Sequence, residues 1–385
     1  MNIAVAIDSF KGSLTSMEAG LAVSEGILRA IPKAHVTVKP LADGGEGTTD
    51  ALTAGLGGES VSVTVTGPCG APVTARYGCL RESGTAVMEM AGAAGITLVP
   101  NGKKDPMKAT TYGVGEMILD AVKRGCRHFL MGIGGSATND GGIGMLTALG
   151  YEFLDREGRR LPPDASALAR VVRVRTDHVC PELAGCRFDI ACDVSNPLTG
   201  PRGATWVYGP QKGVTEEMKP LLDQAMARFG AVTAACTGHD HSQTPGAGAA
   251  GGLGFAFLSY FRTVLTPGAE LIIRATGLDR DLELADVAVT GEGRLDGQTA
   301  MGKAPVCVAR HARRHGCTVV ALAGCVTEEA AGCHEAGIDA FFPVLRQAVT
   351  LEEAMEPEQA KKNLSATAEQ VFRLIRAVRH DSGGQ

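Results

Sequence analysis

The sequence predicts an α/β protein of two domains. Three observations indicate this class: the chain has 385 residues, 44% of them are apolar, and short β-branched runs alternate with helical stretches at both ends. Domains usually contain about 100–200 residues, so this length predicts about two. The runs at both ends are almost continuously apolar, which is typical of parallel strands covered on both faces. We therefore expect a parallel sheet built from both ends of the chain.

The first predicted elements form one strand–helix–strand unit. Residues 3–7 (IAVAI) are a short, continuous apolar run and indicate a buried strand. Residues 16–31 place apolar residues at helical spacing, with Ser16 as the expected cap and Pro32 as the stop. Residues 35–41 predict the next strand. Two strands joined by a helix favour parallel pairing.

The middle of the chain shows a different pattern. Residues 59–90 alternate polar and apolar residues between glycines and prolines, which indicates antiparallel hairpins. Further elements are then expected at 129–133, 188–194, 286–290, 303–315, 318–323, 340–345 and 363–379. The last five of these restore the alternation of strand and helix. We therefore predict an outer domain of residues 1–65 plus 286–385, and an inserted second α/β domain of residues 66–285.

The composition excludes several classes of protein. Glycine is enriched, with 51 residues or about 13% against a usual ~7%, but the G-X-Y period of collagen is absent. The 37 basic and 42 acidic residues are well mixed and form no patch for nucleic acid. No run approaches the ~18 apolar residues of a membrane span, and the first residues do not read as a signal peptide. Eleven scattered cysteines are typical of a reduced cytosol. We expect a cytoplasmic enzyme that uses small molecules, with no nucleic-acid or membrane partner.

The surplus glycines gather in four segments, three of which lie at or beside predicted strand ends. The segments are LADGGEGTTD (41–50), GIGGSATNDGGIG (132–144), PGAGAAGGLG (245–254) and TGEGRLDGQTAMGK (290–303). Ligands of open α/β sheets bind at the carboxyl ends of the strands. Glycine at such a point lets backbone N–H groups approach an anion closely. The glycine segments therefore predict a site for an anionic ligand.

None of the usual nucleotide fingerprints fits these segments well. Residues 297–304 match a Walker-type phosphate loop through Lys303, but Ala304 replaces the Ser or Thr that binds Mg²⁺, and no predicted strand feeds directly into the loop. Residues 132–137 match the dinucleotide pattern, but residues 139–142 (NDGG) would interrupt the helix that should follow. The third glycine segment also contains this pattern, yet it follows a polar loop, and close packing of helices explains it equally well.

Charged residues inside or beside the glycine segments indicate phosphoryl transfer. Several acids, one lysine and one arginine lie there: Asp8, Lys11, Asp43, Glu46, Asp140, Asp193, Glu292, Arg294 and Asp296. Phosphoryl transfer needs carboxylates to hold Mg²⁺ and to orient the acceptor hydroxyl, and cations or N–H groups to stabilise the transferring group. Each acid alone is explained as well by a helix cap or a turn. The set as a whole favours catalysis.

The motifs, in their order along the chain, resemble the bacterial type I glycerate kinase family. The resemblance rests on AIDSFKGSLTSMEA, PLADGGEGTTDAL, GIGGSATNDGG, CDVSNPLTGPRGA with YGPQKG, PGAGAAGGLG and TGEGRLDGQTAMGKAP, which together span nearly the whole chain. It implies a kinase that uses ATP and Mg²⁺ to phosphorylate D-glycerate, most often at the 2-hydroxyl, giving 2-phosphoglycerate and ADP. It also implies a flavodoxin-like, doubly wound domain made by both chain ends, an inserted domain with a mixed sheet, and an active site in the cleft between them.

Expected roles on the substrate side follow from glycerate, which offers one carboxylate and two hydroxyls. Lys11 and Arg294 are expected to serve its carboxylate or the phosphates. Asp193 or Asp296 is expected to orient the acceptor hydroxyl as the catalytic carboxylate. Further expected contacts with substrate are Asp8, Ser9, Asp43, Glu46 and Glu292, of which Asp43 and Glu46 are also the expected ligands of Mg²⁺.

Expected roles on the nucleotide side fall on the second glycine segment. Its loop is expected to hold the phosphates through backbone N–H groups and hydroxyls, with the lysine of GPQKG as a further cation. The residues concerned are Gly134, Gly135, Ser136, Thr138, Asn139, Asp140 and Lys212.

Two other functions remain open from the sequence. An NAD-dependent oxidoreductase on a small hydroxy acid would need an acid about 20 residues after the dinucleotide pattern to bind the ribose, and Glu152 and Asp155 come too early. A non-catalytic sugar-acid binding protein would not need so many acids beside glycine loops. The loop at 239–241 (HDH) is expected to be solvated rather than a metal site. The sequence leaves open 2- against 3-phosphorylation, selectivity among hydroxy acids, the pathway, and the oligomeric state, a homo-oligomer included.

Overall fold

The computed structural model describes residues 1–45, 47–100 and 102–381, and it divides the chain into two compact units. Unit 1 comprises residues 1–43, 54–56 and 269–385, and unit 2 comprises residues 44–53 and 57–268. Unit 1 is therefore assembled from both ends of the chain, and unit 2 from its middle.

The sheet of unit 1 is parallel throughout and confirms the predicted flavodoxin-like class. Its strands are β1 (Asn2–Ile7), β2 (His35–Pro40), β11 (Val287–Leu295), β12 (Thr318–Val326) and β13 (Ala340–Pro343). They are arranged in the order β13-β12-β11-β1-β2. Numbered within the unit this order is 2-1-3-4-5, so the strand order reverses between β1 and β11. Ligands of doubly wound folds bind beside that reversal, at the carboxyl ends of the strands.

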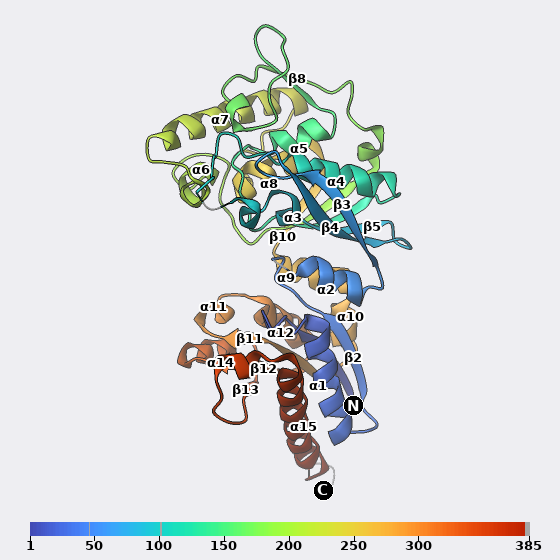
Figure 1. Ribbon diagram of the computed structural model, residues 1–385. Helices are drawn as coiled ribbons and strands as arrows, with labels where there is room; N and C mark the ends of the chain where they lie inside the picture. The colour runs from blue at the N-terminus through green and yellow to red at the C-terminus, as the bar shows by residue number, and fades with distance from the viewer. Residues whose placement is uncertain (46, 101, 382–385) are drawn as a thin grey trace. The chain divides into compact units, whose positions relative to one another are not determined.

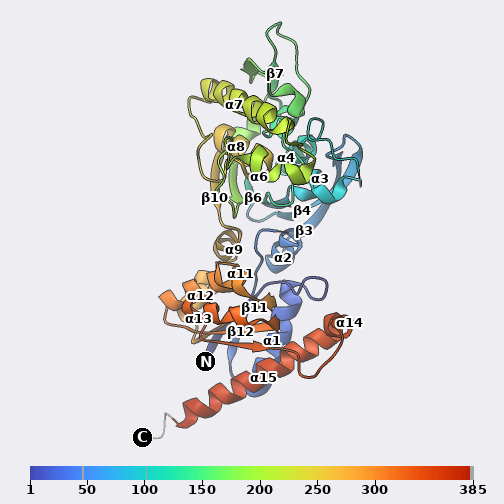
Figure 2. The ribbon, with the colours of Figure 1, turned by 90° about the vertical axis from the view of Figure 1, so that its left-hand side faces the viewer.

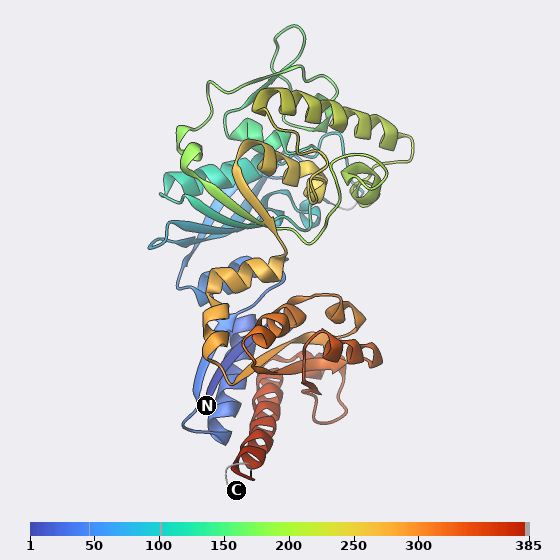
Figure 3. The same cartoon turned by 180° about the vertical axis from the view of Figure 1, so that it is seen from behind.

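Helices cover both faces of this sheet. Helices α1 (Ser16–Ala30) and α15 (Pro357–Asp381) lie side by side on one face, as Figures 1 and 2 show. Helices α10 (Leu278–Leu284) and α12 (Ala304–Arg314) contact β1, β11 and β12 from the other face; α12 is drawn in orange in Figure 3. Side chains alternate along a strand, so Ile3 and Val5 of β1 join the core under α1 and α15. The remaining helices counted with this part of the chain are α9 (Gly268–Thr276), α11 (Gly297–Ala300), α13 (Gly332–Glu335) and α14 (Leu351–Met355).

Unit 2 contains the separate mixed sheet, which is also as predicted. Its order is β10-β9-β6-β5-β4-β3, with strands β3 (Glu59–Thr66), β4 (Pro72–Leu80), β5 (Thr85–Glu89), β6 (His128–Gly132), β9 (Arg187–Ala191) and β10 (Arg262–Thr266). The alternating segment forms antiparallel hairpins from β3 to β5, and β5, β6, β9 and β10 pair in parallel. The rings of Phe129 and Phe188 stack with centroids 4.7 Å apart in its core.

Helices and a small second sheet complete the middle of the chain. The antiparallel pair comprises β7 (Glu152–Leu154) and β8 (Arg173–Arg175). The helices are α2 (Thr48–Gly55), α3 (Ala91–Ala94), α4 (Tyr112–Lys123), α5 (Ile143–Ala148), α6 (Ala204–Tyr208), α7 (Met218–Thr237) and α8 (Ala249–Tyr260). Single 3₁₀ turns lie at Ile96–Leu98, Ala165–Ala167, Pro181–Gly185, Pro210–Lys212 and, in unit 1, Glu328–Ala331. None of the described helices combines the length and the apolar character needed to cross a membrane.

The structure differs from the sequence predictions at several boundaries. The units divide at 43/44 and 268/269, with residues 54–56 counted in unit 1, whereas the sequence places the boundaries near 65 and 285. Strand β3 belongs to unit 2 because it pairs with β4. Thr15, not Ser16, caps α1, because its side chain accepts from the Glu18 amide while the Glu18 carboxylate accepts from the Thr15 amide. Strand β11 continues through Glu292 to Leu295, because its polar end still pairs with β12.

We predict that Gly26 is required for the contact between α1 and α15. A Cβ at Gly26 would collide with the carbonyl oxygen of Ser365 and lie 2.9 Å from its carbon. Gly26→Ala should therefore lower the free energy of unfolding by about 1–3 kcal/mol, despite the gain of ~1 kcal/mol that alanine usually brings within a helix. Denaturant unfolding measures it, with Leu21→Ala on the exposed face of α1 as control, expected within about 0.5 kcal/mol. If Gly26→Ala leaves the free energy of unfolding unchanged or raises it, α15 can shift away from the new methyl group without loss of stability, which contradicts the prediction.

Candidate active site

The first group of predicted residues lies at the strand reversal of unit 1. β1 ends at Ile7, which pairs in register with Gly291 of β11, so Asp8 follows β1 where Glu292 continues β11. The Asp8 amide donates to the Gly291 carbonyl at 2.9 Å, and this hydrogen bond holds the residue after β1 beside β11. Lys11 and Asp43 are 3.8 Å apart beside it. We call Asp8, Lys11, Asp43 and Glu292 the switch-point site.

Asp8 is the most perturbed acid of the switch-point site. Its side chain is buried, and burial raises its pKa to about 7, with the nearby Asp43 and Glu292 adding to the rise. The amide of Ser9 donates to its Oδ1 at 2.6 Å and opposes the rise. Burial also raises the pKa of Glu292, although Thr299 donates its hydroxyl to the Glu292 carboxylate at 2.6 Å. A carboxyl that titrates near neutral pH is suited to accept a proton in catalysis.

Asp296 serves as a helix cap. It accepts from the amides of Gln298 and Thr299 at 3.0 and 3.2 Å and so begins α11. Although partial burial acts to raise its pKa, these amides and the cations Lys303 and Arg294 leave the pKa below its usual range. Arg294 and Lys303 lie 3.5 and 3.7 Å from its carboxylate. Asp296 is therefore a weaker candidate base than Asp8.

The Walker-type segment connects a strand to a helix after all, which corrects one sequence prediction. β11 runs to Leu295, and α12 begins at Ala304 directly after Lys303. Residues 297–300 form the short helix α11 instead of an open loop, and Asp296 already accepts from its first amides. These N–H groups are thus occupied, so the segment lacks the phosphate cradle of a true Walker loop.

The second group of predicted residues forms a loop after β6 in unit 2. Gly134 and Gly135 leave the strand, Gly135 with a φ of +73° that favours glycine. Lys212, from a distant 3₁₀ turn, reaches this loop and donates to the Ser136 hydroxyl at 2.7 Å and to the Thr138 carbonyl at 2.6 Å. We call residues 134–140 with Lys212 the glycine-loop site.

Lys212 is a buried cation without a counter-ion among the described residues. Only 2% of its surface is exposed, and its two hydrogen-bond acceptors are neutral. Burial lowers its pKa to about 7, while the charge of Asp140 acts in the opposite direction. A buried lysine in neutral surroundings is costly unless an anion completes its environment. The geometry therefore fits an anionic ligand.

The other polar residues of the loop are of two kinds: one holds the loop in place, and others have polar atoms without a hydrogen-bond partner among the described residues. Asp140 accepts from the amide and hydroxyl of Thr111 at 2.9 and 2.8 Å and from the amides of Gly142 and Gly144, so it holds the loop in place. Burial raises its pKa. By contrast, the buried hydroxyl of Thr138 and the Oδ1 atom of Asn139 have no hydrogen-bond partner among the described residues. Groups of this kind are expected where a ligand supplies the partner.

The third glycine segment supports this loop. The backbone is left-handed from Ala250 to Gly252, and a Cβ at Gly251 would collide with the carbonyl oxygen of Thr138. The Gly141 amide donates to the Gly251 carbonyl at 2.9 Å. Close packing therefore explains the segment, and its match to the dinucleotide pattern is incidental.

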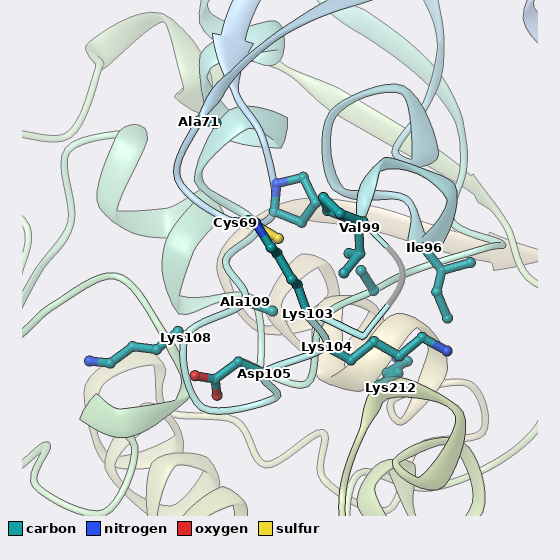
Figure 4. A pocket seen from close by; sticks show the side chains of 13 residues that line it. Cys69, Ala71, Ile96, Val99, Lys103, Lys104, Asp105, Lys108, Ala109 and Lys212 are labelled. Atoms are coloured by element: carbon teal, nitrogen blue, oxygen red, sulfur yellow. The ribbon is translucent and has the colours of Figure 1, made fainter.

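A pocket of about 450 Å³ adjoins the glycine-loop site. Ala137 and Lys212 belong to both, and Figure 4 shows the side chains around it. Its other lining residues are Pro68, Cys69, Ala71, Ile96, Val99, Pro100, Lys103, Lys104, Asp105, Lys108 and Ala109. Sequence reasoning missed Lys103, Lys104 and Lys108, because a short run of lysines usually indicates only a solvated loop. Apolar walls with several lysines suit a ligand that combines a planar ring with phosphates.

Asp193, Ser9 and Glu46 complete the set of predicted residues. Asp193 follows β9, and its carboxylate accepts from the Gly268 amide at 2.9 Å. Ser9 is partly buried beside Asp8. Glu46, predicted to bind substrate or metal, lies outside the described residues.

The residues present fit a nucleotide and Mg²⁺. Phosphate oxygens would satisfy Lys212 and the Thr138 hydroxyl in the glycine-loop site. Carboxylates of the switch-point site offer the oxygen ligands that Mg²⁺ prefers. Among the described residues these carboxylates do not gather into a three-ligand cage.

The structure does not support the alternative of a dinucleotide-binding oxidoreductase, because the two acids nearest to the expected ribose position are paired with arginines. Glu152 forms ion pairs with Arg160 and Arg175, and Asp155 accepts from the Arg159 side chain at 2.9 Å. Helix α5 after the loop has only six residues. The carboxyl with a raised pKa at the switch point and the lysine-rich pocket beside the glycine loop are the kinds of group that a phosphotransferase needs, to accept the hydroxyl proton and to stabilise phosphate charge.

Comparison with known proteins gives the family. The glycerate kinase family pattern matches residues 3–376, and the chain belongs to this family. It is 41% identical over 376 residues to a glycerate kinase of Bacillus subtilis (strain 168), covering 98% of each chain. It is 39% identical over 372 residues to the glycerate 2-kinase of Escherichia coli (strain K12), covering 95% of this chain and 98% of the relative. A crystal structure from Salmonella typhimurium LT2, assigned to glycerate kinase 2, matches with a TM-score of 0.91 and 40% identity over 99% of both chains.

We predict that ionised Asp8 destabilises the metal-free protein above neutral pH. Its pKa is about 7 when folded against 3.8 as the ordinary value, so the folded state holds the proton more tightly and stability falls as pH rises from about 4 to 7. Asp8→Asn removes this penalty and should raise the free energy of unfolding at pH 8 by about 2–4 kcal/mol, with little effect near pH 4.

Chemical unfolding at both pH values in the presence of a chelator measures this difference. The exposed Glu283→Gln on α10 is the control and should change stability by less than about 0.5 kcal/mol at either pH. An Asp8→Asn protein destabilised equally at both pH values would show that Asp8 is an ordinary structural acid.

Proposed function

We propose that the chain is an ATP-dependent glycerate kinase that phosphorylates D-glycerate at its 2-hydroxyl, releasing 2-phosphoglycerate and ADP. The observation that carries this proposal is Asp8, a buried carboxyl with a pKa of about 7 at the switch point of a doubly wound sheet. Family membership supports the reaction, and the name of the Escherichia coli relative, glycerate 2-kinase, supports the position of transfer.

The switch-point site is proposed to bind glycerate. Lys11, with Arg294 and Lys303 close to the end of β11, supplies cations for the carboxylate of the substrate. Asp8 then faces the acceptor hydroxyl and takes its proton as the oxygen attacks the γ-phosphorus and the bond to the β–γ bridging oxygen breaks. This role replaces the one expected for Asp296, whose carboxylate is already committed to the cap of α11.

The glycine-loop site is proposed to bind the phosphates of ATP. Lys212 and the hydroxyls of Ser136 and Thr138 meet the phosphate oxygens, and Lys103 and Lys104 extend the positive charge along the pocket. The apolar walls at Ile96 and Val99 offer a surface for the base. In such reactions the largest contribution to catalysis comes from fixed cations, which stabilise the charge on the transferring group.

Mg²⁺ is proposed to be held by Asp43, with Glu46 as the second carboxylate expected from the sequence. When bound, it neutralises charge on the β- and γ-phosphates. Asp43 also lies 3.8 Å from Lys11, so the same carboxylate positions the lysine. The eleven cysteines are free thiols, which supports the expected cytoplasmic location.

We predict that the purified protein releases ADP when given D-glycerate, ATP and Mg²⁺, measured by a coupled ADP assay. Asp8→Asn should lower kcat by at least about 10²-fold because no group then accepts the hydroxyl proton. Asp296→Asn is the matched control, since asparagine caps a helix as well as aspartate, and should lose less than about tenfold.

Phosphorus NMR of the product distinguishes 2- from 3-phosphoglycerate, and Asp193→Asn is assayed alongside. A loss for Asp193→Asn or Asp296→Asn as large as for Asp8→Asn would move the base away from Asp8. A lack of ADP release above background would refute the kinase itself.

We predict that nucleotide binding protonates Lys212. Its pKa of about 7 leaves it mostly neutral at pH 8, and phosphate oxygens favour the charged form. Calorimetry in two buffers of different ionisation enthalpy should therefore show uptake of close to one proton per ADP bound at pH 8. Lys212→Met should abolish this uptake and weaken binding at least about tenfold, whereas the exposed Lys123→Met should do neither. Equal uptake in Lys212→Met would place the proton elsewhere.

A further inference from the structure

A second cluster of chemically active side chains lies in unit 1, apart from the residues of the switch-point site. Cys307 and His311 are one turn apart on the same face of α12, and Glu270 in the first turn of α9 faces both. The Glu270 carboxylate lies 2.8 Å from Nε2 of His311 and 3.6 Å from Sγ of Cys307. The three ligand atoms lie within 4.8 Å of one another. We call Glu270, Cys307 and His311 the α9–α12 cluster.

The imidazole of His311 is oriented from behind by Asp279 of α10. The Asp279 carboxylate lies 2.7 Å from Nδ1, and the same oxygen is 3.3 Å from Nε2 of His315. A carboxylate on Nδ1 fixes the tautomer and aims Nε2 into the cluster, the usual arrangement behind histidines that bind metals. His311 is itself almost fully buried, while a third of the Glu270 side chain is exposed. The cluster is thus buried at His311 and partly open to solvent at Glu270.

The same three residues are poorly arranged for nucleophilic catalysis by Cys307. Burial raises the pKa of the Cys307 thiol to about 11, and the Glu270 charge adds to the rise, although Arg310 and Arg314 on the same helix oppose it. A reactive cysteine needs the opposite, an electropositive setting that lowers its pKa. A thiol, a carboxylate and an imidazole whose ligand atoms lie within 4.8 Å of one another are together suited to bind a divalent metal ion.

We propose that Glu270, Cys307 and His311 bind one Zn²⁺, with water in the fourth position. Mixed sulfur, nitrogen and oxygen ligands favour zinc over Mg²⁺, which prefers oxygen alone. In a tetrahedral zinc site sulfur and oxygen ligands lie about 3.5 Å apart, and nitrogen and oxygen about 3.3 Å. The sulfur–oxygen distance of the cluster already agrees, and Glu270 has to move from His311 by only about 0.5 Å.

Binding is accompanied by proton release and involves no redox change. The Cys307 thiol loses its proton to solvent as the zinc–sulfur bond forms. The proton that joins Nε2 of His311 to Glu270 leaves as the zinc–nitrogen bond forms. The groups that face these two residues are Glu270 from α9, Asp279 from α10, and Arg310, Arg314 and His315 from α12 and its end. The aspartate stays on Nδ1, so the second ring proton is retained.

The test uses the full-length protein, stripped of metal with a chelator and then titrated with ZnCl₂. Equilibrium dialysis with elemental analysis should give one zinc per chain at micromolar concentration or below. Cys307→Ser, Glu270→Gln and His311→Asn should each weaken binding at least tenfold. Asp279→Asn should weaken it by about 10–100-fold because it orients the histidine without touching the metal. The exposed Cys236→Ser is the matched control and should leave both stoichiometry and affinity unchanged.

Cobalt provides a readout that does not depend on enzyme activity. Co²⁺ added to the stripped protein should give the charge-transfer absorption of a metal–thiolate bond, and Cys307→Ser should remove it. Circular dichroism and thermal melts of each variant exclude loss of fold as the cause, and Glu270→Gln, which keeps the shape of the side chain, tests the site if His311→Asn unfolds. No zinc bound at micromolar concentration, or zinc bound equally well by the Cys307 and Glu270 variants, overturns the proposal.

Discussion

The parallel pairing of β1 with β11 is the interaction on which unit 1 depends. It joins segments as much as 284 positions apart in the chain, since Asn2 donates to Asp286 beside the register of Ile3 with Val287. Closing so long a loop is entropically unfavourable. The apolar faces of the two strands provide the compensating burial under α1 and α15. The same pairing places the reversal of strand order between β1 and β11, and the acids at their ends therefore come together.

Buried charge of opposite sign marks the two candidate sites. Asp8 in unit 1 and Lys212 in unit 2 are each buried, and burial is the main reason that each has a pKa of about 7. Such groups lower stability in the absence of a ligand. They persist in folded proteins mainly where function requires them, because a ligand then supplies the missing partner. Asp140 shows the contrast, since four donors satisfy its carboxylate and leave it a structural role.

The surplus of glycine has two physical causes. At Gly135, Gly141 and Gly142 the backbone has a positive φ, which side chains disfavour, and the loop after β6 depends on these turns. At Gly26 the cause is space, because another backbone lies where a Cβ would be, and at Gly251 this lack of space acts together with a positive φ. The glycine loop is therefore shaped both by its own turns and by the segment packed against it.

The sequence by itself determined the α/β class, the parallel strands at both ends, the hairpins of the middle and the segments that carry the candidate sites. These features depend on local patterns of apolar residues and glycine, which the chain shows directly. Only the tertiary structure separated Asp296 and Asp140, which cap or brace, from Asp8, because hydrogen-bond donors and burial come from elsewhere in the chain. It placed β3 in unit 2, since its pairing with β4 outweighs its position along the chain. It also brought Lys212 to the glycine loop and Glu270 to His311, contacts that no local pattern encodes because they join separate elements.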